Sequence, residues 1–184
     1  MNIVAISGSQ HKKGNTAILI SMIIKEIRNN TTSKHTISFY SIGKKAFKPC
    51  KGCKACIKKG RCTIKSDDWD RIAKKMLKAD LIIIGSPVFF HDISGPLKTF
   101  MDRTYSLWHA RQLKGTRIIA VVVSKRSETA RALESITLWA QLHEMKIIAT
   151  VCGKRDAHFN IKSNASCQKS VKKAVKIALG ITTS

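Results

Sequence analysis

The chain has 184 residues, of which 43% are hydrophobic, which is enough for one domain with a sizeable core. No apolar run reaches the roughly 18 residues of a membrane-spanning helix, and no basic segment precedes an apolar one at the N-terminus, so neither a membrane protein nor an exported one is expected. We therefore expect a cytoplasmic protein, in which clustered cysteines indicate metal or redox chemistry more than disulfides.

The charge balance is strongly basic, with 34 Lys and Arg against 11 Asp and Glu and a formal net charge of +23. Such an excess favours anionic partners, among them nucleic acid, acidic proteins and phosphorylated ligands. The lysines are spread along the chain, without the interleaved aromatic residues or helix-turn-helix pattern that would read bases. We interpret most of them as solvated surface residues and expect neither nucleic acid nor a membrane as a partner.

Apolar and amphipathic segments alternate along the chain. In order, the patterns predict a strand over 2–7, a helix over 15–29, a strand over 35–42, an irregular insertion over 43–66, a helix over 67–79, a strand over 80–87, a helix over 93–108, a strand over 116–124, a helix over 128–145, a strand over 146–153 and a C-terminal extension over 154–184 with a helix over 166–179. This alternation predicts one α/β domain over 1–184, doubly wound, with a five-stranded parallel sheet covered by helices on both faces.

The loop SGSQHKKGNT, residues 7–16, follows the first strand, and ligands of such folds bind at the carboxyl ends of strands. Backbone N–H groups at the start of the next helix can cradle a phosphate. Four polar side chains accompany them: Ser7, Ser9, Asn15 and Thr16. The loop matches neither the Walker nor the dinucleotide pattern, so its mostly neutral donors suit a phosphate that is held and not transferred. An ordinary strand-to-helix turn explains the loop equally well.

A rigid apolar and aromatic run follows the third strand and comprises Pro87, Val88, Phe89 and Phe90. Such a loop can flank a flat ring and offer backbone amides to its polar edge, although the two phenylalanines could instead belong to the core. His91 is a candidate proton donor beside the ring, with a satisfied loop histidine as the alternative. A phosphate cradle and an aromatic loop together are what flavin mononucleotide (FMN) needs.

Three segments in order carry a family resemblance: SGSQHKKGNT, the cysteine loop followed by DDW, and ADLIIIGSPVFFHDISGPLKTFMDR. Over residues 1 to about 125 the chain resembles the NADPH-dependent FMN reductase and iron–sulfur flavoprotein group of the flavodoxin-like superfamily. The resemblance implies a flavodoxin-like sheet in the order 2-1-3-4-5, with a cysteine-rich loop inserted after the second strand. It also implies bound FMN and a homodimer or a dimer of dimers.

Carried over by position, the resemblance assigns two groups of FMN-binding residues. The phosphate would be held by Ser7, Ser9, Gly14, Asn15 and Thr16, and the ring and ribityl chain would be lined by Pro87, Val88, Phe89 and Phe90. Many relatives have a glycine-rich flavin loop after the fourth strand, whereas this chain has SKRSETARALES, in which Ser124 to Ser127 could approach the ring. The chain has no recognisable nicotinamide-binding pattern.

Four cysteines lie close together in the insertion with the spacing Cys50-x2-Cys53-x2-Cys56-x5-Cys62. Zinc sites usually use two pairs with a longer spacer, whereas bacterial ferredoxins use a comparably compact run. Gly52 and Gly60 would permit the sharp turns of such a loop. These features favour a 4Fe–4S cluster, as the resemblance also implies, over zinc or free thiols.

The insertion also contains many lysines and no acidic residue. These lysines would offset the negative charge of a thiolate-ligated cluster and form a docking face for an acidic donor such as ferredoxin. The leading hypothesis is an FMN-dependent oxidoreductase that passes electrons from ferredoxin through the cluster to FMN and on to a quinone, oxygen, peroxide or another flavin. The alternatives are an NAD(P)H-dependent FMN or quinone reductase without a cluster, and a non-enzymatic flavodoxin-like electron carrier or redox-sensing module.

Several other residues are given structural roles. Cys152 and Cys167 are predicted to be small buried apolar residues. Asp102 and Arg103 are predicted to form an interface or helix-end ion pair. The three tryptophans are interpreted as helix-face packing, with contact between subunits as a further role: Trp69, Trp108 and Trp139.

Overall fold

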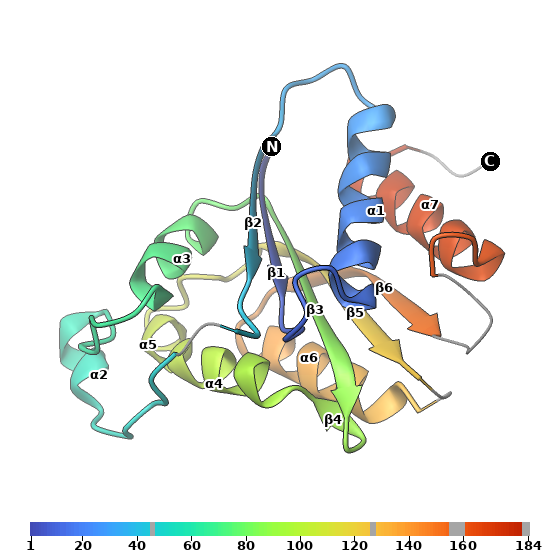
Figure 1. Cartoon of the computed structure of the whole chain (residues 1–184). Coiled ribbons are helices and arrows are strands. Elements are labelled where there is room, and N and C mark those ends of the chain that lie inside the picture. Colours follow the sequence, from blue (N-terminus) through green and yellow to red (C-terminus); the bar gives the residue numbers. More distant parts are fainter. Residues whose placement is uncertain (45–46, 126–127, 155–160, 182–184) are drawn as a thin grey trace.

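The computed structural model describes residues 1–44, 47–125, 128–154 and 161–181, and its core is a parallel sheet (Figure 1). The parallel strands are β1 (Asn2–Ser7), β2 (Thr36–Ser41), β3 (Leu81–Phe89), β5 (Arg117–Ser124) and β6 (Lys146–Lys154). They pair in the order β2-β1-β3-β5-β6, which is 2-1-3-4-5 when only the parallel strands are counted. The predicted flavodoxin-like topology is therefore confirmed.

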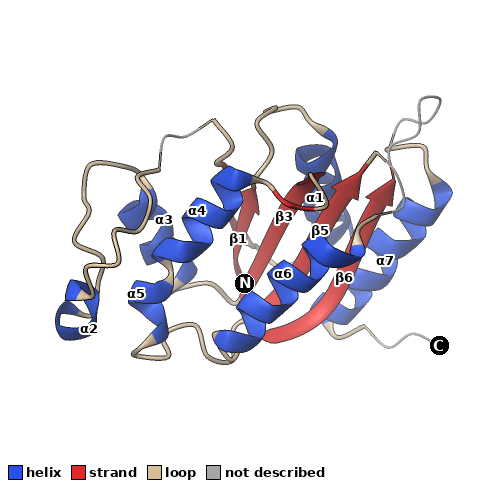
Figure 2. Ribbon diagram, turned by 90° about the horizontal axis from the view of Figure 1, so that it is seen from below, coloured by secondary structure: helices blue, strands red, loops and turns tan. Residues whose placement is uncertain are grey.

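Helices cover both faces of the sheet (Figure 2). Helices α1 (Asn15–Asn29) and α7 (Ala165–Leu179) pack on one face of the sheet. They contact the strand side chains that point to this face, such as Ile3, Ile83 and Val121. Helices α3 (Trp69–Met76), α4 (Gly95–Arg103), α5 (Tyr105–Trp108) and α6 (Ala130–Leu142) cover the other face. The central strands are buried on both sides, which explains why they read as continuous apolar runs.

Three local features differ from the sequence-based expectation. The predicted helix over 93–108 is divided at Thr104, whose Oγ1 donates to the carbonyl of Met101 at 2.6 Å and competes with the helical pattern. Within the irregular insertion, residues 55–59 form the short helix α2 (Ala55–Lys59). A two-residue strand, β4 (Asp92–Ile93), pairs antiparallel with the end of β3.

The glycine positions of the cysteine loop agree with the expectation. Gly52 and Gly60 have φ angles of 64° and 63°, in the left-handed region that glycine adopts without steric cost. Within the described residues, no helix is long and apolar enough to cross a membrane.

Candidate functional site

A cavity of about 910 Å³ opens at the carboxyl ends of β1, β3 and β5. Its wall contains most of the residues predicted to bind the flavin: Ser9, Gly14, Asn15, Thr16, Pro87, Val88, Phe89 and Ser124. The volume lies within the range of ligand pockets, roughly 300–1,000 Å³. Loops far apart in the sequence therefore form one site, although Arg126 and Ser127 of the fourth strand's loop lie outside the described residues.

The loop before α1 is shaped to receive an anion. Helix α1 begins after Gly14 without a side-chain cap, so its first-turn N–H groups, which have no partner within the helix, face the start of the loop. The Ser9 hydroxyl lines the cavity and accepts a hydrogen bond from the backbone N–H of His11 at 3.2 Å. A Cβ at Gly14 would lie 2.7 Å from Ser9 Oγ and 3.0 Å from the His11 carbonyl oxygen, so a larger residue would displace the Ser9 hydroxyl.

Ser7 lies beneath this loop and outside the cavity wall. It is fully buried, and its Oγ accepts a long hydrogen bond of 3.4 Å from the backbone N–H of Ser9. Gly43, which the sequence-based prediction missed, packs against the same loop, and a Cβ there would lie 2.1 Å from the carbonyl oxygen of Ser9. Ser7 and Gly43 therefore lie behind the loop, outside the described cavity wall.

The cavity is more basic than the neutral-donor prediction suggested. Its lining includes five residues with basic side chains: His11, Lys12, Lys13, Lys44 and Lys125. The described lining contains no acidic residue. A phosphate held at the start of α1 would therefore lie in a positive field from side chains as well as from the helix dipole.

The aromatic loop divides into a cavity-lining part and an exposed tip. Pro87, Val88 and Phe89 line the cavity, whereas the Phe90 side chain is 99% exposed and lies outside the wall. Phe90 and His91 are the central residues of the turn between β3 and β4 and have φ angles of 46° and 67°. Two positive φ values are typical of a type I′ hairpin turn, which is uncommon for bulky residues.

His91 makes the contact expected of a satisfied loop histidine. Its Nδ1 lies 3.3 Å from Glu128 Oε2, and His91 is absent from the cavity wall. The neighbouring Asp92 accepts a hydrogen bond from the Ser135 hydroxyl at 2.6 Å. Hydrogen bonds from Ser135 and the Ile93 backbone, with the charge of Arg131, outweigh the effect of burial and lower the pKa of Asp92.

A second, small cavity of about 30 Å³ is lined by all four clustered cysteines, Cys50, Cys53, Cys56 and Cys62. Desolvation and the neighbouring cysteines raise the pKa of the Cys56 thiol, whereas a backbone hydrogen bond from Ala55 leads the causes that lower the pKa of Cys53. Among the described residues, no three His, Cys, Asp or Glu side chains are grouped closely enough to hold one metal ion.

Four clustered thiols are a donor set that a zinc ion or an iron–sulfur cluster can use. A zinc ion needs all its ligands at about 2.0–2.3 Å from one point. In a cubane each of four irons takes its own thiolate, so the sulfur atoms stay further apart and surround the group. The four thiols that line one cavity wall provide the number of ligands that a cubane requires.

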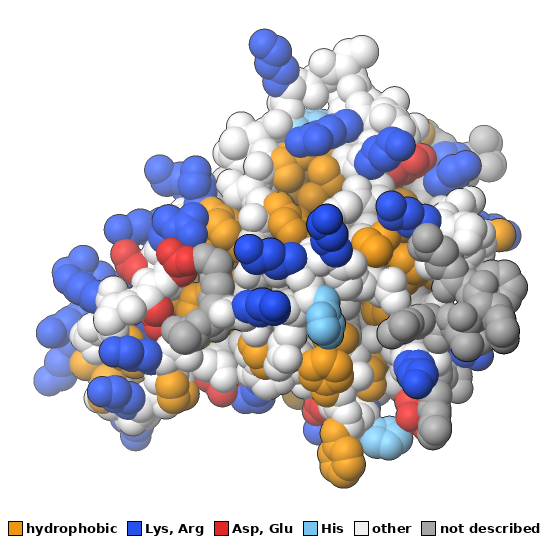
Figure 3. Space-filling view, in the orientation of Figure 1, with side chains coloured by type: hydrophobic (Ala, Val, Ile, Leu, Met, Phe, Trp, Pro, Cys, Tyr) orange, Lys and Arg blue, Asp and Glu red, His pale blue; other side chains and the backbone are white. Residues whose placement is uncertain are grey.

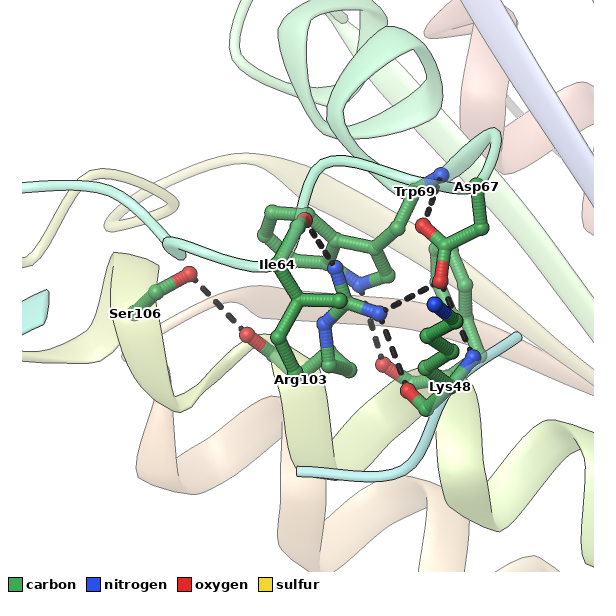
Figure 4. A network of polar contacts seen from close by, with 7 residues as sticks. Lys48, Ile64, Asp67, Trp69, Arg103 and Ser106 are labelled. Atoms are coloured by element: carbon green, nitrogen blue, oxygen red, sulfur yellow. Dashed lines mark hydrogen bonds and ion pairs between the residues drawn. The ribbon is translucent and has the colours of Figure 1, made fainter. Parts of the chain in front are cut away.

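Arg103 does not pair with its neighbour Asp102. Asp102 instead forms an ion pair with Lys98 one turn earlier, and Arg103 is buried and bonded to Asp67, with Nη1–Oδ2 at 2.7 Å (Figure 4). The prediction of an Asp102–Arg103 pair is therefore wrong. Sequence reasoning missed the Asp67 contact because the partners are 36 residues apart.

The remaining sequence-based roles have mixed outcomes. Cys167 is buried as predicted, but Cys152 is exposed because β6 is an edge strand. Trp69 and Trp139 pack in the core, whereas Trp108 is 41% exposed.

Comparison with known proteins connects these features with a family. A family model described as NADPH-dependent FMN reductase matches residues 1–156. An iron–sulfur flavoprotein of Methanocaldococcus jannaschii is 35% identical over 150 residues, which cover 80% of this chain and 76% of that protein. An iron–sulfur flavoprotein of Methanosarcina thermophila is 30% identical over 151 residues, with coverages of 80% and 77%. The solved structure of a flavodoxin from the domain Archaea is similar in fold, with a TM-score of 0.61 at 16% identity, covering 98% of this chain and 99% of that one.

Proposed function

The chain belongs to the NADPH-dependent FMN reductase family of flavin-dependent oxidoreductases, and we propose that it is an iron–sulfur flavoprotein that binds FMN and a 4Fe–4S cluster. The observation that carries the proposal is the presence of two sites in one chain. One is a basic, flavin-sized cavity at the ends of the strands, and the other is a cavity lined by four cysteines.

In the larger cavity the chain supplies binding and orientation. The first-turn N–H groups of α1, with the hydroxyls of Ser9 and Thr16, would hold the FMN phosphate, and Lys12 and Lys13 would balance its charge. The rigid wall of Pro87, Val88 and Phe89 would hold the ring flat and exclude water from one side.

In the smaller cavity the four cysteine thiolates would hold the cluster, and backbone hydrogen bonding eases the deprotonation of Cys53. When bound, the cluster would carry single electrons and FMN would collect them in pairs for a small acceptor such as a quinone, oxygen, peroxide or another flavin. None of the side chains described is required to act as an acid or base in this scheme.

The basic surface supports an acidic protein as the electron donor. Lys and Arg side chains gather at the end of the molecule that carries α2 (Figure 3). A ferredoxin-like donor would be steered to this face by charge, so its association should slow as salt is added. Reversing the charge of the exposed pair Lys58 and Lys59 on α2, which lie outside the cysteine cavity, should slow reduction by ferredoxin, whereas the same change at Lys172 and Lys173 on α7 should not.

A second copy of the chain is the proposed occupant of the α5–α6 face. Trp108, Leu138 and Leu142 are 41%, 52% and 58% exposed there and border cavities of about 330 and 550 Å³. This supports the homodimer, or dimer of dimers, that the family resemblance implies. Leu142→Glu should shift the sedimenting species toward the monomer, and Ile177→Glu, at an exposed apolar residue of α7, should not.

The experiment that tests the central proposal is anaerobic purification followed by assays of flavin, iron and acid-labile sulfide. The expected sample is brown, with broad visible absorbance beneath the flavin bands. A yellow sample that contains FMN but no iron or sulfide, even after anaerobic reconstitution, would contradict the cluster and leave the flavin site standing.

The family description favours one alternative, direct reduction by NAD(P)H without a cluster. The lysines of the large cavity would suit a phosphorylated dinucleotide as well as FMN. Stopped-flow reduction with NADPH and with reduced ferredoxin, compared in the same preparation, decides between the two donors.

A further inference from the structure

Arg103 joins the two ends of the cysteine loop. It lies in the last turn of α4 and is 1% exposed. Its Nη1 donates to the carbonyl of Lys48 at 2.9 Å, and its Nη2 donates to the carbonyl of Ile64 at 2.9 Å (Figure 4). Lys48 comes two residues before Cys50, and Ile64 comes two residues after Cys62, so a single guanidinium closes the loop at its base.

Asp67 also takes part in this closure, because it binds the same Nη1 group of Arg103 that binds the Lys48 carbonyl. One carboxylate oxygen accepts from Arg103 Nη1 at 2.7 Å and from the Lys48 N–H at 2.9 Å, and the other accepts from the Trp69 N–H at 3.1 Å. Burial acts to raise the pKa of Asp67, but the hydrogen bonds from Arg103 and the two N–H groups outweigh it and keep that pKa below its usual range. The pair is therefore ionised.

A purely structural ion pair would account for part of this arrangement, because buried pairs often stabilise a fold no better than apolar residues of similar volume. Two observations indicate that Arg103 also has a role toward the cysteine cavity. Arg103 lies in the wall of the cavity that the four cysteines line, whereas Asp67 does not, so the positive end of the pair is on the cysteine side. The buried Nε–H of Arg103 also has no hydrogen-bond partner among the described residues.

A buried N–H without a partner is costly and rare, and it calls for an acceptor. An anionic cluster held by the four thiolates would supply sulfur acceptors and negative charge at the cavity wall in which Arg103 lies. The guanidinium cannot turn away to find another partner, because its Nη groups are bonded to two loop ends and its Cζ lies over the Trp69 ring, 5.0 Å from the ring centre.

We propose that Arg103 is a positioning residue of the cluster: it clamps the cysteine loop and places a fixed positive charge against the cluster, which raises the cluster's reduction potential. The inference rests on the proposed iron–sulfur function. A positive charge stabilises the reduced, more negative form of the cluster, so its removal lowers the potential. The clamp itself acts on the loop whether or not the cluster is present.

The test compares three variants of the full-length protein. Arg103→Lys keeps the charge but cannot bond both loop ends in the same plane. Arg103→Met combined with Asp67→Asn removes the charges without leaving a buried carboxylate unpaired. The control is Arg71→Met, because Arg71 also pairs with an aspartate and lies over an aromatic ring, that of Tyr40, but is exposed.

Two measurements are made on each variant: the reduction potential of the reconstituted cluster, and hydrogen exchange of the cysteine loop in metal-free protein. The double variant should show a lower potential and at least tenfold faster exchange over residues 48–64. Arg103→Lys should show the faster exchange with a potential near that of the wild type. Arg71→Met should match the wild type in both measurements.

A folded double variant with unchanged potential and unchanged exchange would overturn the inference. If the double variant does not fold, an unchanged exchange rate in Arg103→Lys would overturn the clamp. A wild-type protein that takes up no iron would overturn the proposed function and the tuning of the potential together, and the exchange rates would still decide whether Arg103 clamps the loop.

Discussion

The hydroxyl of Ser94 donates a hydrogen bond to the carbonyl oxygen of Gly8 at 2.8 Å, across 86 residues of sequence. Ser94 is fully buried, and its own N–H donates to the Ser86 hydroxyl at 2.8 Å. The loop that would hold the flavin phosphate is thereby fastened to the loop that would flank the ring. This buried bond, which no short motif contains, adds to the β1–β3 pairing and to the 2.8 Å bond from the Gly8 N–H to the Gly85 carbonyl, which also join the two halves of the cavity.

Replacing Ser94 by alanine should weaken both the fold and the flavin site. Loss of the donor leaves the Gly8 carbonyl short of a buried partner, at a cost of about 1–3 kcal/mol in the free energy of unfolding. The affinity for FMN, measured by flavin fluorescence titration, should fall severalfold because the two loops lose one of the bonds that join them and keep only the β1–β3 pairing and the bond from the Gly8 N–H to the Gly85 carbonyl. Ser21→Ala is the control, since it removes a 2.8 Å bond within α1 alone; equal FMN affinities of the two variants would contradict the prediction.

Gly43→Ala should deform the phosphate loop without touching the ligand. The new Cβ would lie 2.1 Å from the Ser9 carbonyl oxygen and 2.4 Å from the Gln10 nitrogen, so the backbone must move. We expect the FMN dissociation constant to rise at least tenfold, about 1.4 kcal/mol. Gly95→Ala is the matched control because a Cβ there meets no atom within 4 Å. If both variants raise the FMN dissociation constant by a similar small factor, the phosphate loop tolerates the added Cβ and the prediction is wrong.

Serine in place of any of the four clustered cysteines should lower the iron and sulfide content of anaerobically reconstituted protein, while bound FMN stays close to the wild-type amount. The cysteine cavity and the flavin cavity share no lining residue among those described, so loss of one site leaves the other intact. Cys152→Ser provides the control, since this exposed thiol lies on β6. Full iron content in all four variants would exclude the loop as the ligand set.

His143 should make the fold sensitive to acid. Thr104 Oγ1 donates its hydrogen to the Met101 carbonyl, so in the 2.9 Å contact with His143 Nε2 the imidazole is the donor. The unprotonated Nδ1 is buried without a partner among the described residues. Burial lowers the pKa of His143 from 6.5 to about 4.

Because the unfolded chain takes up this proton near pH 6.5 and the folded chain only near pH 4, the free energy of unfolding should fall as the pH drops between these values. At about 1.4 kcal/mol per pKa unit, the loss should amount to about 3 kcal/mol in urea unfolding experiments. His143→Gln keeps a donor for Thr104 and does not titrate, so its stability should decline less over the same range. Parallel pH profiles of the two proteins would contradict the prediction.

Much of this protein follows from local sequence. The strands and most helices lie within a few residues of their predicted ranges, because each is specified by apolar residues that are close together in the chain. Eight of the predicted flavin-site residues line one cavity, since loops that follow parallel strands meet at the same edge of a sheet. The compact cysteine spacing likewise keeps its four thiols close enough to line one cavity.

Tertiary structure decided what depends on distant partners. The turn at Phe90 and His91 contains neither glycine nor asparagine, so the sequence gives no sign of a tight turn. The turn is evident only from the pairing of β4 with β3 in the structure. The contacts of Ser94 with Gly8 and of Arg103 with Asp67 were also absent from the sequence-based prediction, because their partners are 86 and 36 residues apart in the chain. A hydroxyl or a guanidinium has no preferred partner in the linear chain; burial, which removes water as the alternative, gives each of them a single set of acceptors.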